Sequence, residues 1–174
     1  MSCALILGGA RSGKSRIAEA RALATGGQPW YIATAWGADT HDGDIEMQQR
    51  VAQHKKDRGD AWQLIEEQTA LSGALRSIDQ PGRIILVDCL TLWLNNCLHH
   101  KCWLEQRQAL LDCLPALTAD VIFVSNEVGS GIVPLGALSR TFADEAGWLN
   151  QRVAEHCERV DLVVAGLEMR LKSP

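Results

Sequence analysis

The sequence has no apolar run of the ~18–20 residues that a membrane-spanning helix needs, so we expect no membrane span. It has no C-x-x-C pair; its six cysteines are scattered through apolar stretches, which favours reduced, packed thiols over a disulfide framework. It has no basic excess, because 17 Lys and Arg stand against 21 Asp and Glu and give a net charge of −4. That balance argues against nucleic acid or an anionic membrane as a partner. The N-terminal segment has no basic leader and runs straight into glycines, so we predict no signal peptide and a cytoplasmic location.

The residues that are present predict an α/β protein. The length of 174 residues, 47% hydrophobic and 22% charged, fits a single domain covering residues 1–174. Six short apolar runs have strand character, at 3–7, 30–35, 62–65, 83–88, 121–125 and 161–165. Segments of helical length lie between them, at 14–24, 44–58, 69–79, 90–113 (broken near 99–101) and 137–158. Strands that alternate with helices predict a mostly parallel sheet flanked by helices on both faces.

The segment GGARSGKS at residues 8–15 matches the phosphate-binding pattern G-x-x-x-x-G-K-[ST]. A predicted strand precedes it and a predicted helix follows it, as the pattern requires. Its glycines let successive backbone amides curl around phosphate oxygens at the positive end of the helix. Lys14 would reach the β and γ phosphates, and the hydroxyl of Ser15 could bind Mg²⁺. The alternative is an ordinary strand–loop–helix turn with a solvated lysine, but pattern and context together favour a P-loop nucleotide site.

Asp88 ends the predicted strand 83–88. An acidic residue at this place commonly holds Mg²⁺ directly or through water, as the Walker B partner of a P-loop. The alternative is a helix N-cap or a solvated strand end. We therefore predict that Ser15 and Asp88 are the metal residues.

Two other polar groups have less certain roles. Glu127 lies in a glycine-rich loop after the predicted strand 121–125, where it could orient a substrate or cap the loop. Cys97, His99, His100 and Cys102 superficially resemble metal ligands, but their spacing is too compressed for the usual zinc geometry.

The predicted helix 44–58 carries Glu46, Arg50, His54 and Arg58 at four-residue spacing, along one face. The arginines one turn on either side of His54 attract phosphate and favour its neutral imidazole, the form that can attack phosphorus. Glu46 opposes that effect. From this segment alone, we favour an exposed helix with i,i+4 charge pairs and an incidental histidine.

Seven ordered blocks, of which the P-loop is the first, are spread over nearly the whole chain. They are LGGARSGKS at 7–15, YIAT at 31–34, E-M-x-x-R-V-x-x-H at 46–54, DCLTLWL at 88–94, S-N-E-V-G-x-G-I-V-P at 125–134, A-G-x-x-N-Q at 146–151 and VAGL at 164–167. In this order they closely resemble the bifunctional adenosylcobinamide kinase/adenosylcobinamide-phosphate guanylyltransferase family of cobalamin biosynthesis. The sequence departs from the family pattern at Ala35, where a serine is common, and at Glu168, where a proline is usual.

The resemblance implies a RecA-like P-loop fold, a homotrimer and two reactions. ATP or GTP phosphorylates the aminopropanol hydroxyl of adenosylcobinamide. GTP then transfers its GMP through a histidine to the new phosphate, which gives adenosyl-GDP-cobinamide and pyrophosphate. The family's guanylylated histidine falls on His54, and this reverses the preference for an incidental histidine.

The resemblance also carries over a set of nucleotide-contacting positions. They are Gly8, Gly9, Ala10, Arg11, Ser12, Gly13, Lys14, Ser15, Ala33, Thr34, Ala35, Lys55, Lys56, Asp57, Arg58, Glu66 and Asp88. Lys14 and His54 would be the catalytic pair, with Mg²⁺ as cofactor and GTP or ATP as co-substrate.

Two other functions remain alternatives. A plain P-loop small-molecule kinase would leave His54 as a bystander. A GTP-dependent switch is disfavoured because the chain has no Asn-Lys-x-Asp motif, which such switches use to select guanine.

Overall fold

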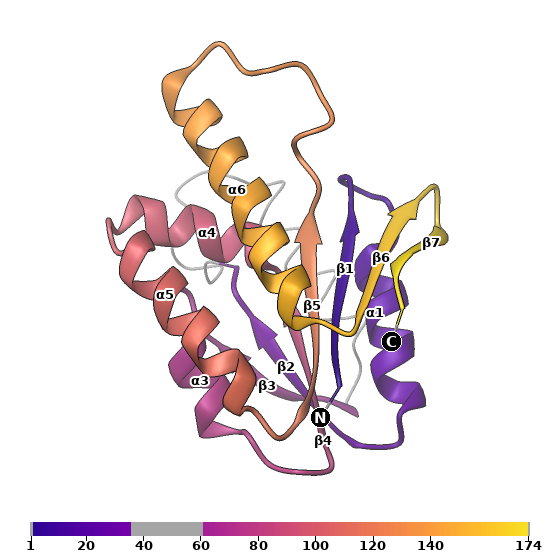
Figure 1. The fold of residues 1–174 in the computed structure, drawn as a ribbon. Helices are drawn as coiled ribbons and strands as arrows, with labels where there is room; N and C mark the ends of the chain where they lie inside the picture. Colours follow the sequence, from indigo (N-terminus) through magenta and orange to yellow (C-terminus); the bar gives the residue numbers. More distant parts are fainter. Residues whose placement is uncertain (1, 36–60, 174) are drawn as a thin grey trace.

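Within the part of the chain that the structure describes, a sheet of seven strands, in the order β3-β2-β4-β5-β1-β6-β7, runs through the centre (Figure 1). The computed structural model describes residues 2–35 and 61–173. The strands are β1 (Cys3–Gly8), β2 (Gln28–Ala33), β3 (Gln63–Glu66), β4 (Arg83–Asp88), β5 (Asp120–Asn126), β6 (Arg159–Val164) and β7 (Leu167–Lys172). The helices are α1 (Lys14–Ala24), α3 (Leu71–Ser77), α4 (Leu90–His99), α5 (Trp103–Cys113) and α6 (Ala137–His156), with a 3₁₀ turn at Leu114–Ala116.

All neighbouring strands are parallel except β6 and β7, which form an antiparallel pair. Helix α1 lies on one face of the sheet, and α3, α4, α5 and α6 lie on the other (Figure 1). In β4, Ile85 and Val87 pack in the core beneath α3 to α6, whereas Ile84 and Leu86 pack in the core beneath α1. Burial on both faces explains why this strand is continuously apolar. The expected α/β class, mostly parallel sheet and flanking helices are confirmed.

The expected elements within the described residues are present, with shifted ends. The helix expected at 69–79 is shorter because Glu67 Oε1 accepts the amides of Thr69 and Ala70 before it begins. Its last turn tightens, with the amide of Ile78 donating to Leu75 O. The expected break near 99–101 is confirmed, since Lys101 has φ 58° between α4 and α5. The strand expected at 161–165 ends at Val164 because Ala165 and Gly166 turn the chain, with φ values of 53° and 78°.

The sequence analysis missed β7. Its residues LEMRLK alternate apolar and polar after an Ala-Gly turn, a pattern typical of the second strand of a hairpin. Every residue of the strand is exposed, so it lacks the continuous apolar run that marks the buried strands.

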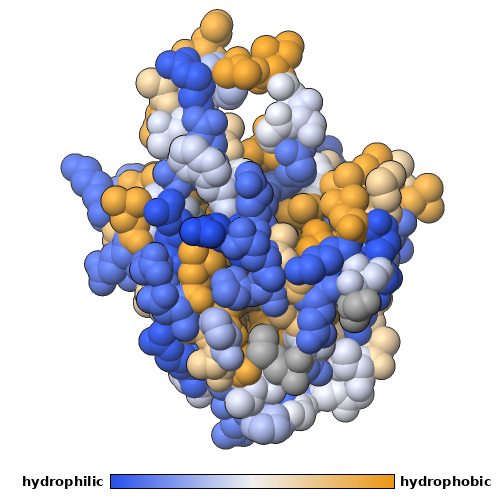
Figure 2. Space-filling view, viewed as in Figure 1, coloured by the Kyte–Doolittle hydropathy of each residue, from blue (hydrophilic) through white to orange (hydrophobic). Residues whose placement is uncertain are grey.

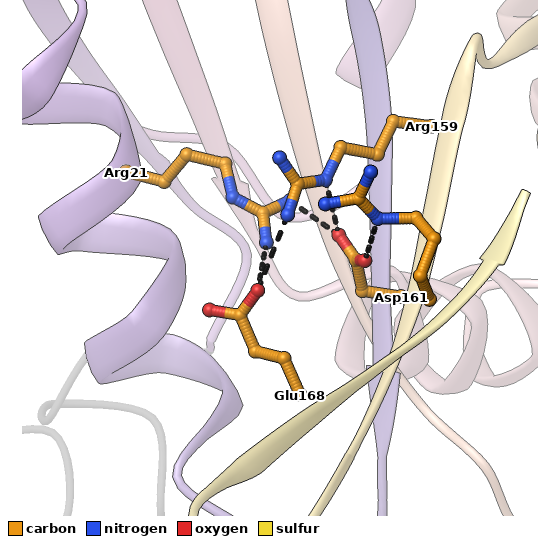
Figure 3. A network of polar contacts seen from close by, with 5 residues as sticks. Arg21, Arg159, Asp161 and Glu168 are labelled. Carbon is orange, nitrogen blue, oxygen red and sulfur yellow. Dashed lines mark hydrogen bonds and ion pairs between the residues drawn. The ribbon is translucent and has the colours of Figure 1, made fainter. Parts of the chain in front are cut away.

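A polar network joins this hairpin to α1 (Figure 3). Asp161 in β6 is only 1% exposed and pairs with Arg21 of α1 at 2.7 Å, and with Arg159 and Arg170 at 2.6 Å each. Glu168 of β7 pairs with Arg21 at 2.6 Å and with Arg159 at 3.2 Å. The network therefore fixes the hairpin to the helix that follows the glycine loop.

The segment between β5 and α6 projects beyond the sheet together with the first turns of α6 (Figure 1). Ile132 is 98% exposed and Leu135 99% exposed, and Val133 and Leu138 are also largely exposed. Figure 2 shows hydrophobic surface gathered at this projecting end. Within the described residues, no helix is both long and apolar enough to cross a membrane.

Candidate nucleotide site

The residues expected at the site come together along the carboxyl edge of the sheet. Strand register places Glu66 beside Ala33 and Ala33 beside Asp88. Asn126, at the end of β5, pairs with Gly8, the first residue of the glycine loop. Four strands and the loop thus present their ends at the edge where open parallel sheets bind ligands.

The glycine loop needs its glycines for two different reasons. A Cβ at Gly8 would lie 2.5 Å from Ser12 Oγ and 2.6 Å from the carbonyl oxygen of Val163. Gly13, the N-cap of α1, has φ 95°, a conformation that a side chain disfavours. Ser12 Oγ is buried and has no hydrogen-bond partner among the described residues. A phosphate oxygen in the loop would supply the partner that this hydroxyl lacks.

The loop is also supported from the C-terminal hairpin. The amide of Gly166, in the β6–β7 turn, donates to the carbonyl of Ser12 at 2.9 Å. At the other side of the loop, the amide of Glu127 donates to the carbonyl of Gly8 at 3.1 Å. Both bonds hold the backbone from outside the loop itself.

Lys14 begins α1 and is buried, and its Nζ donates to the carbonyl of Gly9 at 3.1 Å. Burial lowers the pKa of Lys14 below its ordinary value of 10.5, while the nearby Cys89 and Asp88 act in the opposite direction. The ammonium therefore lies within electrostatic reach of the acidic end of β4. A triphosphate in the loop would add the negative charge that favours its protonated form.

Asp88 is held at the end of β4 by a neighbouring strand. Tyr31 of β2 donates its phenolic proton to Asp88 Oδ2 at 2.8 Å. The backbone amide of Thr34 donates to the carbonyl of Asp88 at 3.3 Å. Both the carboxylate and the backbone of Asp88 are thus held by groups of the neighbouring segment.

The donor atoms of Ser15 and Asp88 fit a magnesium ion, which prefers hydroxyl, carboxylate and water oxygens. Ser15 lies in the first turn of α1, next to Lys14, and Asp88 lies at the end of β4, which β5 separates from β1 in the sheet. Elsewhere, no group of three or more His, Cys, Asp or Glu that could hold a metal occurs in residues 2–35 and 61–173. The Cys97 and Cys102 thiols donate to the backbone carbonyls of Thr69 and Cys97.

The side chain of Glu127 caps the loop that follows β5. Its Oε1 accepts the amide of Gly129 at 2.7 Å, and its Oε2 accepts the amide of Ser130 at 3.2 Å. Burial opposes these bonds, but they prevail and lower the pKa of Glu127. Of the two roles considered from the sequence, the structure shows the loop cap.

Part of the expected site lies outside the described residues. This part comprises the expected helix 44–58 with His54, Lys55, Lys56, Asp57 and Arg58. Ala35 is described and half-buried just after β2. The sequence analysis missed Tyr31 and Gly166 as site residues, although both lie in the blocks YIAT and VAGL that carry the family resemblance, which were the available signal.

Fold and site together define a P-loop nucleotide-binding protein: a parallel sheet, a glycine loop between β1 and α1, a buried lysine and a strand-end aspartate. The family model described as cobinamide kinase / cobinamide phosphate guanyltransferase matches residues 4–171. The chain belongs to this family of bifunctional enzymes.

Curated relatives match along nearly their whole length. A Pseudomonas aeruginosa protein named bifunctional adenosylcobalamin biosynthesis protein CobP is 53% identical over 171 residues, covering 97% of this chain and 96% of the relative. The Escherichia coli protein named bifunctional adenosylcobalamin biosynthesis protein CobU is 35% identical over 184 residues, covering 97% and 98%. These relatives support cobalamin biosynthesis as the process in which the chain takes part.

Solved structures with lower similarity were also found. The flagellar accessory protein FlaH from Methanocaldococcus jannaschii has a TM-score of 0.47 and 14% identity, covering 99% of this chain and 78% of that one. A KaiC-like protein from Pyrococcus horikoshii has a TM-score of 0.45 and 12% identity, covering 92% and 70%.

Proposed function

We propose that the chain first phosphorylates adenosylcobinamide and then guanylylates the product. In the kinase step, the aminopropanol hydroxyl oxygen attacks the γ-phosphorus of ATP or GTP on residues 8–15. The bond from that phosphorus to the β–γ bridging oxygen breaks, the nucleoside diphosphate leaves, and the hydroxyl loses its proton. The arrangement that carries this proposal is the buried Lys14 in a glycine loop beside Asp88.

In the second reaction, a ring nitrogen of His54 attacks the α-phosphorus of GTP. The bond from that phosphorus to the α–β bridging oxygen breaks and pyrophosphate leaves, so that GMP remains on His54 as a phosphoramidate. A phosphate oxygen of adenosylcobinamide phosphate then attacks the same phosphorus, the P–N bond breaks, and adenosyl-GDP-cobinamide forms. The covalent intermediate divides one displacement into two.

The chain's own groups have separate tasks in both reactions. The amides of residues 8–15 bind phosphate oxygens, and Lys14 stabilises charge that develops on the triphosphate. Ser15 and Asp88 would hold Mg²⁺, which when bound neutralises part of that charge. Ala33, Ala35 and Glu66, at the ends of β2 and β3, would form the remaining described wall of the nucleotide site.

Covalent labelling tests the transferase half. With GTP labelled at the α-phosphate, we expect label on the wild-type protein that is stable to alkali and labile to acid, and that maps to His54. His54→Ala should take up no label. His156→Ala, at the C-terminal end of α6, is the matched control and should label like the wild type.

The outcomes separate the two candidate functions. Label on His54→Ala would exclude this nucleophile. A wild type that never labels, yet transfers γ-phosphate to adenosylcobinamide, would be a plain kinase. A wild type that phosphorylates ordinary nucleosides without any dependence on cobinamide would exclude the proposed substrate.

We further infer that the enzyme acts in the cytoplasm as a homotrimer. The exposed apolar side chains near Ile132 and Leu135 support contact between subunits, because monomers rarely expose large apolar patches. Light scattering coupled to size-exclusion chromatography tests the trimer, and a monomeric mass at micromolar concentration would exclude it.

A further inference from the structure

Thr34, which directly follows β2, and Tyr31 within β2 both hydrogen-bond to the end of β4. Thr34 is fully buried, and its hydroxyl donates to the carbonyl of Cys89 at 2.7 Å. The same hydroxyl accepts the amide of Cys89 at 2.8 Å. The bonds fix the residue that directly follows Asp88.

The hydroxyl of Thr34 is therefore committed to the protein. A hydroxyl has one proton to donate, and here that proton goes to Cys89 O. Asn96 of α4 secures the same residue by donating its amide to the carbonyl of Thr34 at 2.8 Å. Because Thr34 has no exposed surface, its side chain acts on a nucleotide through the backbone it holds rather than by contact.

Tyr31 acts on the carboxylate directly. It is nearly fully buried, and its ring packs edge-to-face against Trp62 with centroids 5.6 Å apart. Its phenolic hydroxyl donates to Asp88 Oδ2 at 2.8 Å. The hydrogen bond restricts rotation of the carboxylate and uses one acceptor site of Oδ2.

We propose that Tyr31 and Thr34 are positioning residues that orient the carboxylate of Asp88 before it engages the cation of the bound nucleotide. Thr34 fixes the backbone at Cys89, and Tyr31 fixes the side chain of Asp88. A carboxylate that is already oriented loses less conformational freedom when it binds a metal or its water. The inference rests on the proposed role of Asp88 in holding Mg²⁺.

The test measures metal binding separately from nucleotide binding. Mn²⁺ replaces Mg²⁺, and its affinity for the protein–GTP complex is read by electron paramagnetic resonance. GTP binding without metal is read by calorimetry. The variants are Tyr31→Phe, which keeps the ring, Thr34→Val, which keeps the shape, and Thr34→Ser, which restores the hydroxyl.

We expect Tyr31→Phe and Thr34→Val to weaken Mn²⁺ binding about tenfold, the scale of one lost hydrogen bond to a charged or buried group. Their metal-free GTP affinity should stay within about twofold, because the glycine loop is untouched. Thr34→Ser should recover most of the loss. Thr25→Val, which removes a hydroxyl bonded to Ala22 O at the far end of α1, is the matched control and should bind Mn²⁺ like the wild type.

Asp88→Asn distinguishes failure of this inference from failure of the proposed function. If Asp88→Asn weakens Mn²⁺ binding and Tyr31→Phe does not, the positioning role is overturned while the metal role of Asp88 stands. Equal losses of metal-free GTP affinity and Mn²⁺ affinity in Tyr31→Phe would also overturn it. If Asp88→Asn binds Mn²⁺ like the wild type, the inference falls together with the metal role, and labelling of His54 remains a separate question.

Discussion

The amide of Gly166 donates to the carbonyl of Ser12 at 2.9 Å, so the C-terminal hairpin contacts the glycine loop near the opposite end of the chain. A Cβ at Gly13 would lie 3.5 Å from the Cα of Gly166, which shows how closely the two turns pack. The hairpin is also tied to α1 through Arg21 and Asp161. Loop and first helix are thus held from outside by one element.

Gly166→Ala tests this support. Gly166 has φ 78°, so a side chain should cost about 1–2 kcal/mol of the free energy of unfolding and shift the amide that Ser12 accepts. We expect the Kd for GTP to rise severalfold. Gly26→Ala is the matched control, because Gly26 has φ 72° and open space around it but lies at the far end of α1. It should lose similar stability and keep its GTP affinity; equal loss of affinity in both variants would exclude a specific role for Gly166.

Asp161→Asn tests the network shown in Figure 3. The substitution leaves three arginines facing a neutral group and should lower the free energy of unfolding, measured in urea at pH 7, by about 2–4 kcal/mol. Glu168→Gln, whose carboxylate is 37% exposed, should cost less. Equal stability of the two variants would contradict the central place of Asp161.

The lowered pKa of Asp161 predicts that the free energy of unfolding falls at acid pH. Burial alone would raise the pKa of Asp161, but hydrogen bonds from Arg159, Arg170 and Arg21 prevail and hold it below the ordinary value of 3.8. Because the pKa is lower in the folded than in the unfolded state, the stabilisation is complete above pH 3.8 and is lost as the pH falls from there through the folded pKa. Urea titrations from pH 5 to pH 2 should show a smaller acid dependence in Asp161→Asn than in the wild type. If the free energy of unfolding fell equally with pH in the wild type and in Asp161→Asn, Asp161 would not be the source of the acid dependence.

The lowered pKa of Lys14 predicts that GTP affinity falls at alkaline pH, as an alkaline limb in the pH profile of binding. Burial lowers its pKa from 10.5, so the free protein should begin to lose this charge, and with it GTP affinity, below pH 10.5. Fluorescence titration with a labelled GTP from pH 7 to pH 10 measures the limb. Lys14→Met should flatten it and reduce phosphoryl transfer by about 100-fold or more. Lys101→Met, on the exposed turn between α4 and α5, should retain both; a limb that persists in Lys14→Met would assign the titration to another group.

The cysteines predict a selective pattern of alkylation. All six are free thiols, and five of them are buried. Burial raises the pKa of Cys89 to about 12 and that of Cys113 to about 11, so neither forms much thiolate at pH 8. Cys102, the partly exposed thiol, should react first with N-ethylmaleimide in the native protein, as read by peptide mass mapping. Early modification of Cys89 would contradict the buried position of the β4 end.

The sequence by itself determined the buried strands, the helices between them and the glycine loop with Lys14, because local periodicity and turn chemistry are written in consecutive residues. It also marked Asp88 as the strand-end carboxylate. Only the tertiary structure decided which groups orient that carboxylate, since Tyr31 and Asp88 lie 57 positions apart and meet only when β2 and β4 pair. The exposed strand β7 and its pairing through Asp161 were likewise decided in space, because an edge strand buries little apolar surface and its ion pairs join residues that no local pattern links.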